Sequence, residues 1–107
     1  MKLIKTTFRE EGNLLIMTFE GKIDSPYTVE VEKDMEVLYD CEGRDIRLDL
    51  TNLRYISSSG LRLFLNLLKH AREVGSHVEV VGLSGYMQRV FEVTGFTRLF
   101  KILQSQT

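Results

Sequence analysis

The chain opens with two segments in which apolar and polar residues alternate with the period of a half-buried β-strand. These segments cover residues 2–8 and 14–19. Residues 10–13 between them have the composition of a hairpin turn. The pattern therefore predicts that a β-hairpin begins the fold.

Two longer segments have helical periodicity. Ser25 followed by Pro26 is typical of an N-cap with proline at the first helical position, which predicts a helix to about residue 39. Its predicted inner face carries Val31, Met35, Leu38 and Tyr39. A second helix is predicted up to Gly75, because apolar residues recur at spacings of 3, 4 and 7 at Leu61, Phe64, Leu65 and Leu68.

The rest of the chain alternates between strand and helix. Strands are predicted at residues 45–50 and 77–81, and a third helix at residues 86–93, where Gly95 ends it. Residues 99–103 suit a short final strand or helix. Because this half alternates and the first half opens with a hairpin, we expect an α/β fold with a mixed sheet.

Composition narrows the class of protein. Of 107 residues, 43% are hydrophobic and 27% charged, which excludes a disordered chain, and a net charge of -1 gives no electrostatic case for nucleic acid. The single Cys41 has no partner for an internal disulfide, as is usual in a reducing cytosol. No export signal or apolar run of about 20 residues is present, so we expect a cytoplasmic protein without a membrane span.

Three consecutive hydroxyl residues, Ser57, Ser58 and Ser59, lie where the third strand gives way to the second helix. The N-terminus of a helix leaves backbone N–H groups unpaired and carries the positive end of the helix dipole. Oxygen acceptors and phosphate groups are therefore favoured at this place. The residues alone leave two interpretations open, helix capping and a recognition or modification site.

Signals for catalysis and for metal or cofactor binding are weak. A serine nucleophile needs a nearby base, yet His70 lies about 15 Å along the helix that Ser59 begins. His70 and His77 are seven residues apart, which is not a metal-ligand spacing. Residues 82–85 lack the lysine of a phosphate-binding loop. We therefore expect no enzyme activity, no metal and no cofactor.

Four ordered blocks carry a resemblance to a known family. They are residues 21–24 (GKID), 46–50 (IRLDL), 55–61 (YISSSGL) and 90–95 (VFEVTG). Together they resemble the STAS domain family over nearly the whole chain, which implies a single domain of residues 1–107. The resemblance also implies the family's fold, a small mixed sheet of four to five strands with about three helices largely on one side.

The best understood members of this family are bacterial anti-sigma factor antagonists. In their phosphorylated members the loop has the pattern Asp-Ser-Ser/Thr-Gly, and the hydroxyl residue before the glycine accepts phosphate. The resemblance places this acceptor at Ser59, with Ser58 and Gly60 beside it and Ser57 at the acidic position, which is a departure from the pattern. A second acidic position of the family is kept as Asp24.

The resemblance implies a function in a partner-switching pathway. The unphosphorylated chain would bind an anti-sigma factor that is a serine kinase, with ATP held by that partner, and phosphorylation at Ser59 would release it. A serine phosphatase would be a further partner. Asp24, Ser57, Ser58 and Gly60 would form the binding loop.

Two alternatives stay open. The chain is instead a STAS binding module without phosphorylation, acting as a structural or regulatory subunit of a signalling complex or of a lipid or anion transport complex. Asp24, which directly precedes Ser25 and Pro26, is equally suited to capping the first helix.

Overall fold

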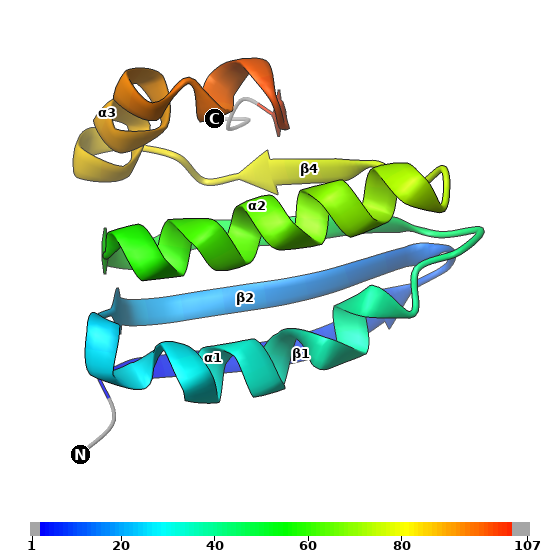
Figure 1. Ribbon diagram of the computed structural model, residues 1–107, viewed down its shortest axis with the longest axis horizontal. Coiled ribbons are helices and arrows are strands. Elements are labelled where there is room, and N and C mark those ends of the chain that lie inside the picture. The colour runs from blue at the N-terminus through cyan, green and yellow to red at the C-terminus, as the bar shows by residue number, and fades with distance from the viewer. Residues whose placement is uncertain (1–2, 104–107) are drawn as a thin grey trace.

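A five-stranded mixed sheet forms the centre of the computed structural model, which describes residues 3–103 (Figure 1). The strands follow the chain order β1-β2-β3-β4-β5; the first pair is antiparallel and the other three pairs are parallel. Their bounds are β1 Ile4–Glu11, β2 Leu14–Ile23, β3 Asp45–Ile56, β4 Val78–Val81 and β5 Lys101–Leu103. The predicted α/β fold with an opening hairpin is confirmed.

The helices lie largely on one side of this sheet. The α-helices are α1 Thr28–Met35, α2 Ser58–Glu73 and α3 Gly85–Thr94, with 3₁₀ turns η1 Ser25–Tyr27, η2 Glu36–Tyr39 and η3 Phe96–Arg98. In Figure 1, α1 and α2 run side by side in front of the sheet and α3 lies beyond β4. The third helix ends at Gly95 in the left-handed conformation (φ 81°), as predicted from the sequence.

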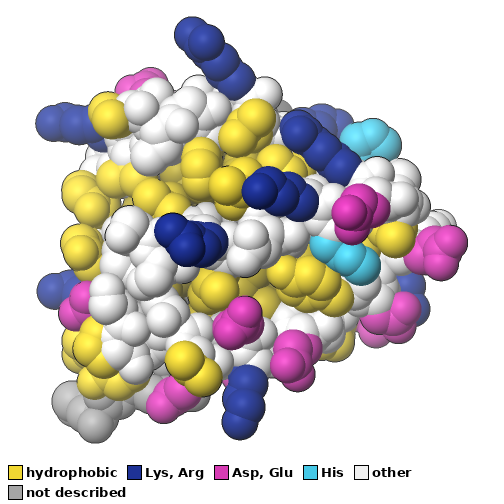
Figure 2. Space-filling model, in the orientation of Figure 1, with side chains coloured by type: hydrophobic (Ala, Val, Ile, Leu, Met, Phe, Trp, Pro, Cys, Tyr) yellow, Lys and Arg dark blue, Asp and Glu magenta, His cyan; other side chains and the backbone are white. Residues whose placement is uncertain are grey.

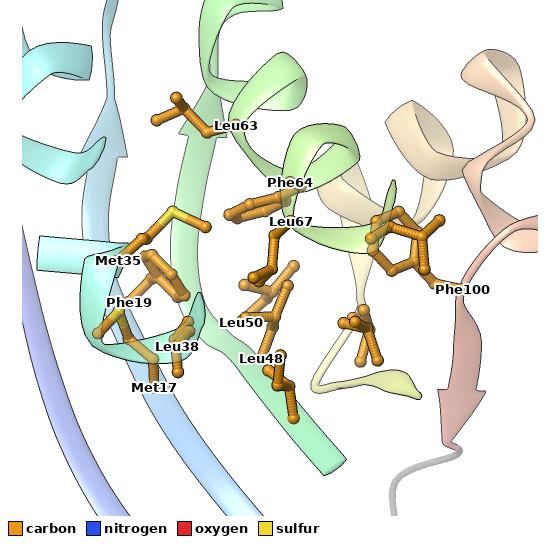
Figure 3. Close-up of a cluster of buried hydrophobic side chains, with 14 of the residues drawn as sticks. Met17, Phe19, Met35, Leu38, Leu48, Leu50, Leu63, Phe64, Leu67 and Phe100 are labelled. Atoms are coloured by element: carbon orange, nitrogen blue, oxygen red, sulfur yellow. The ribbon is translucent and has the colours of Figure 1, made fainter. Parts of the chain in front are cut away.

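The core fills the space between the helices and the sheet (Figure 3). The rings of Phe19 from β2 and Phe64 from α2 meet edge to face, with centroids 5.3 Å apart. The buried residues of α2 are Gly60, Leu63, Phe64, Leu67, Leu68 and Ala71. The predicted apolar face of this helix, which included Leu61 and Leu65, is therefore partly wrong, since these two residues are only partly buried. Because α2 packs against α1 as well as the sheet, its buried arc is turned toward Leu63 and Leu67.

Two boundaries differ from the prediction. β3 continues six residues beyond Leu50, although Thr51 and Asn52 are both exposed and break the alternation. The register between β2 and β3 shifts here, so an irregularity in the pairing accommodates the extra residue. At the first helix Ser25 lies inside η1, and the capping residue is Asp24, because its carboxylate accepts the Ser25 N–H.

Candidate functional site

The serine loop begins where two parallel strands end together. Ile23 at the end of β2 is in register with Ile56 at the end of β3. The Ser57 N–H donates to the Ile23 carbonyl at 2.9 Å, which ties the two chain exits to each other. Asp24 and Ser57 are the next residues on the two strands, so they emerge side by side at the carboxyl edge of the sheet.

Ser57 starts α2 and organises the loop. It is only 6% exposed, and its Oγ accepts the Gly60 N–H at 3.1 Å as an N-cap. The same oxygen shares a hydrogen bond with the Ser59 Oγ at 3.0 Å. Ser57 therefore satisfies an otherwise unpaired donor of the helix and also fixes the position of the Ser59 hydroxyl.

The three hydroxyl groups differ in their access to solvent. Ser58 is exposed, Ser59 is half-buried and Ser57 is buried. A reactive partner can approach the first two residues but has little access to the third. The loop therefore offers Ser58 and Ser59 to an incoming molecule, with Ser57 beneath them.

Gly60 holds the start of α2 close to the ends of both strands. A Cβ at this position would lie 2.7 Å from Ile56 Cγ1 and 2.8 Å from Ile23 Cγ2. Both isoleucines are buried, so neither side chain has room to withdraw far. The absence of a side chain at residue 60 therefore allows the serines to sit directly over the strand ends.

Asp24 lies at the same end of the sheet but is engaged locally. Its Oδ1 accepts the Ser25 N–H at 2.9 Å, which is the capping role that the sequence left open. Within residues 3–103 no hydrogen bond joins the Asp24 side chain to the serines. The fold thus gathers all five predicted site residues at one edge, with Asp24 beside the loop rather than bonded to it.

An aromatic pair next to the serines was not predicted from the sequence. The rings of Tyr55, at the end of β3, and Tyr86, at the start of α3, stack with centroids 5.9 Å apart and planes 19° apart. Both tyrosines are exposed, at 37% and 47%. The position of Tyr55 two residues before Ser57 was the only available signal, because its partner is 31 residues further on.

Beside this pair lies a shallow hollow of about 310 Å³ between β3 and the start of α3. Its lining residues are Thr51, Asn52, Leu53, Arg54, Ser84, Gly85, Tyr86 and Met87. The hollow exists because β3 extends beyond Leu50, so it too could not be foreseen from the predicted strand.

Charge is unevenly distributed around the site. Residues 50–72, which include the loop and nearly all of α2, contain four basic residues and no acidic one. Residues 24–42, which include α1, contain seven acidic residues and one lysine. Figure 2 shows dark blue side chains over α2 and magenta ones over α1 below it. The serine loop lies at the boundary between these regions.

The histidines lie away from the loop. His70 Nε2 is 2.8 Å from the Tyr39 carbonyl, at the opposite end of α2, and His77 is exposed. Burial, followed by the nearby carboxylate of Glu32, raises the pKa of Tyr39 above its ordinary value. Across residues 3–103 no group of three or more His, Cys, Asp or Glu side chains is arranged to hold a metal ion. No helix in this described range is long and apolar enough to cross a bilayer.

These features define a small α/β domain that presents hydroxyl groups at a helix start over the ends of parallel strands. The STAS domain family model matches residues 5–106. The chain therefore belongs to the STAS domain family.

The chain is also similar to proteins named as anti-sigma factor antagonists. The chain is 31% identical to BtrV of Bordetella bronchiseptica over 103 residues, covering 96% of this chain and 89% of BtrV. It is 35% identical to the anti-sigma-B factor antagonist of Listeria monocytogenes over 82 residues, covering 77% of this chain and 72% of that protein. SpoIIAA of Bacillus, solved in its phosphorylated form, is similar in fold at a TM-score of 0.72 and 15% identity, covering 95% of this chain and 92% of SpoIIAA.

Proposed function

We propose that this chain is an anti-sigma factor antagonist that works as a single STAS unit in a cytoplasmic partner switch. The unmodified chain binds an anti-sigma factor that is a serine kinase, and phosphorylation at Ser59 ends the complex. The observation that carries the proposal is the serine loop of Ser57, Ser58 and Ser59, in a chain 35% identical to an anti-sigma-B factor antagonist. A serine phosphatase then restores the binding form.

The loop residues have separate roles in this proposal. Ser59 is the phosphate acceptor, since it is the hydroxyl residue directly before Gly60, as in the family pattern; it is half-buried, and its Oγ is hydrogen-bonded to Ser57 Oγ at 3.0 Å. Ser58 is exposed and contacts the partner directly. Gly60 keeps the loop low over the strands, and Asp24 adds a carboxylate at the edge of the contact surface.

The chemistry belongs to the partner. The Ser59 oxygen forms a bond to the γ-phosphorus of ATP held by the kinase, the bond from that phosphorus to the β–γ bridging oxygen breaks, and ADP leaves. The hydroxyl proton of Ser59 passes to a base of the kinase, because the group that is hydrogen-bonded to the Ser59 hydroxyl is the hydroxyl of Ser57, which is not a base. The chain is thus a substrate and a binding protein.

Release follows from charge. A phosphoserine carries about -1.5 to -2 charges at pH 7. A partner surface that fits neutral hydroxyl groups would have to desolvate this dianion, and each ~1.4 kcal/mol of lost binding energy weakens the complex tenfold. Because Ser59 is at a helix N-terminus, the domain itself tolerates the added charge.

The test uses the anti-sigma factor kinase encoded nearest to this chain in its genome. The purified chain is incubated with the kinase and ATP, and intact mass and complex formation are measured. We expect one phosphate, loss of the complex, and neither effect in Ser59→Ala. Ser58→Ala is the matched control: it should still gain one phosphate, and only its affinity for the kinase should fall. Phosphate addition that persists in Ser59→Ala would refute the site, and absence of any complex would refute the function.

One residue, Ser57, favours a second candidate function. Ser57 occupies the acidic position of the family pattern, and a hydroxyl group supplies no carboxylate to orient the acceptor or a metal-bound nucleotide. The chain would then be a STAS binding module without phosphorylation, a subunit of a signalling or transport complex. A stable complex with no phosphate addition in the same experiment would select this function.

A further inference from the structure

β1 is a long strand with one open edge. It lies at the end of the sheet and runs for eight residues, Ile4–Glu11, whereas three residues of β5, at the opposite edge, lie within the described part of the chain. Natural proteins usually protect an edge by keeping it short, because unpaired backbone groups invite another strand. The length of β1 therefore makes it the edge that is open to strand addition.

The register with β2 identifies the backbone groups that face outward. The Lys22 N–H donates to the Leu3 carbonyl at 2.9 Å, and Ile4 is opposite Gly21. Because hydrogen-bonded and free positions alternate along an antiparallel strand, the backbone groups of Thr6 and Phe8 point away from β2. Within residues 3–103 no hydrogen bond from another element satisfies these outward groups.

We propose that a second copy of this chain pairs with β1, antiparallel, with Phe8 on the two-fold axis. If the outward-facing residues of the two copies pair with one another, the two-fold axis passes either through one of these even-numbered residues or through an odd-numbered residue between two of them. Centring on Thr7 would place Lys5 opposite Arg9 of the second copy, and centring on Arg9 would place two arginines opposite each other. Like charges in direct opposition destabilise a sheet, so these registers are disfavoured.

The register centred on Phe8 has complementary charges. It places Lys5 opposite Glu11 of the second copy, and by symmetry Glu11 opposite the second copy's Lys5. Glu11 already pairs with Arg9 of its own strand at 3.0 Å, so Lys5 of the second copy would join this pair. Among the described residues, from Leu3 onward, a register centred on Thr6 avoids like charges but sets no opposite charges against each other, and it overlaps over fewer residues of β1. The pairing on Phe8 is therefore the one that the charges select.

Apolar residues gather at the same place on the helix side. Thr6 donates to Asp34 of α1 at 2.8 Å, which fixes the alignment of the helix with the strand. Val37 is one helical turn beyond Asp34 and Phe8 is two strand residues beyond Thr6; the two elements run in the same direction (Figure 1), so these side chains lie at about the same level. Val37 is 42% exposed, and pairing on Phe8 would bring the two copies of Val37 toward each other.

The proposed dimer has room for its helices and leaves the serine loops accessible. α1 packs over both β1 and β2, so strand spacing places the two α1 helices about 10 Å apart, an ordinary helix packing distance. The loops lie at the ends of β2 and β3, away from the paired edge. Since α1 is acidic, its approach to the second α1 weakens the dimer, and we expect a dissociation constant on the order of 10 μM.

Sedimentation equilibrium of the full chain tests the proposal, at protein concentrations from about 1 μM to about 1 mM. The wild-type chain should be a reversible dimer. Lys5→Glu and Glu11→Lys should each weaken the dimer about tenfold, because each replaces two ion pairs with two like-charge pairs. The double variant with both substitutions exchanges the charges and should recover the wild-type affinity.

Further variants distinguish pairing at the β1 edge from unspecific effects of charge or of lost folding. Lys101→Glu makes the same charge change on the other edge strand and should leave the dimer unchanged. Thr6→Pro removes an outward N–H that β2 does not use, and Thr6→Val is its control, because it loses the same hydroxyl bond to Asp34 but keeps the N–H. Thr6→Pro should weaken the dimer more than Thr6→Val does, while circular dichroism reports the retained fold. A wild-type monomer at 1 mM, single variants without effect, or a double variant that fails to recover would each overturn the proposal.

Discussion

At the scale of single residues, the loop depends on the buried hydroxyl of Ser57. Its Oγ accepts the Gly60 N–H at 3.1 Å and also bonds to Ser59 Oγ. The resemblance to the family pattern places an acid at this position, and Asp, Asn, Ser and Thr are all effective N-caps. Ser57 therefore caps α2 without supplying a charge.

Ser57→Ala should destabilise the domain by about 1 kcal/mol, because a buried N-cap bond is lost. Ser84 offers a matched control, since it is the N-cap residue of α3 but makes no side-chain capping bond. Ser84→Ala should stay within about 0.5 kcal/mol of the wild type. Urea denaturation of the two variants measures the difference, and equal losses would show that capping is not what Ser57 contributes.

Tyr39 should make stability depend on alkaline pH. Its pKa is raised, first by burial and then by Glu32, so the folded chain holds the phenolic proton after the unfolded chain has released it. The stabilisation is complete below about pH 10, the ordinary value, and is lost as the pH rises through the folded pKa. When the pH is raised from about 8 to above 10, the urea midpoint of Tyr39→Phe should therefore fall less than the midpoint of the wild type.

The exposed ring of Tyr86 provides the comparison for this measurement. Tyr86→Phe should keep the wild-type dependence on pH. If the urea midpoints of both variants fall as much as that of the wild type, groups other than Tyr39 account for the loss of stability at alkaline pH.

At the scale of elements, the long strand β3 positions both the loop and the hollow next to it. Thr51, at its irregular point, is approached closely by the connection from β4 to α3: a Cβ on Gly82 would lie 2.2 Å from Thr51 Oγ1 and 2.6 Å from Thr51 N. Gly82 also has a φ of 82°. A side chain at residue 82 is therefore opposed both by the backbone conformation and by its neighbour.

Gly82→Ala should cost several kcal/mol, more than the ~1 kcal/mol expected for alanine at positive φ alone. Gly75→Ala measures the backbone contribution alone, because the φ of Gly75 is 78° and nothing lies within 4 Å of its Cβ position, so the difference between the two variants gives the contribution of the contact with Thr51. Chemical denaturation of Gly82→Ala and Gly75→Ala compares them directly. Equal losses would mean that the connection shifts away from β3 at little cost.

Sequence patterns predicted the elements better than their ends. The run at residues 45–50 identified β3, but its extension through Thr51 and Asn52 depends on pairing with β2, which a local pattern does not encode. By contrast, Leu63 and Leu67 widen the apolar arc of α2 in the sequence itself, which indicates packing against a second helix, and both are core residues because α2 packs against α1.

The site was predictable in its local part only. The serines and Gly60 are consecutive in the chain, so the sequence placed them together at a helix start. The neighbouring position of Asp24 follows from parallel pairing of β2 with β3. The stacking of Tyr55 on Tyr86 joins residues brought together only by the folded sheet.

At the scale of the whole molecule, a net charge of -1 conceals a strong separation of charge. The acidic residues of 24–42 cover α1, and the basic residues of 50–72 cover α2 (Figure 2). The serine loop joins the two regions, so a phosphate at Ser59 changes the potential where a partner would meet both. Such a change alters recognition through the surface field without any change of fold.

The domain should therefore keep its structure when Ser59 is phosphorylated. Phosphoserine can be encoded genetically at residue 59, which makes the measurement independent of any kinase. The phosphate is near the N-terminus of α2, where a negative charge gains about 0.3 to 1 kcal/mol. At low ionic strength the melting temperature should rise by about 1 to 4 °C, because 1 kcal/mol corresponds to about 4 °C in a domain of this size.

Two comparisons identify the cause of this shift. At 1 M salt the Debye length is about 3 Å, so the increase in melting temperature should largely vanish. Phosphoserine in place of Glu73, the last residue of α2, puts the charge at the negative end of the same helix and should give no increase. If phosphoserine at residue 59 instead abolishes the cooperative transition, the modification unfolds the domain, and a switch that acts through surface charge alone is excluded.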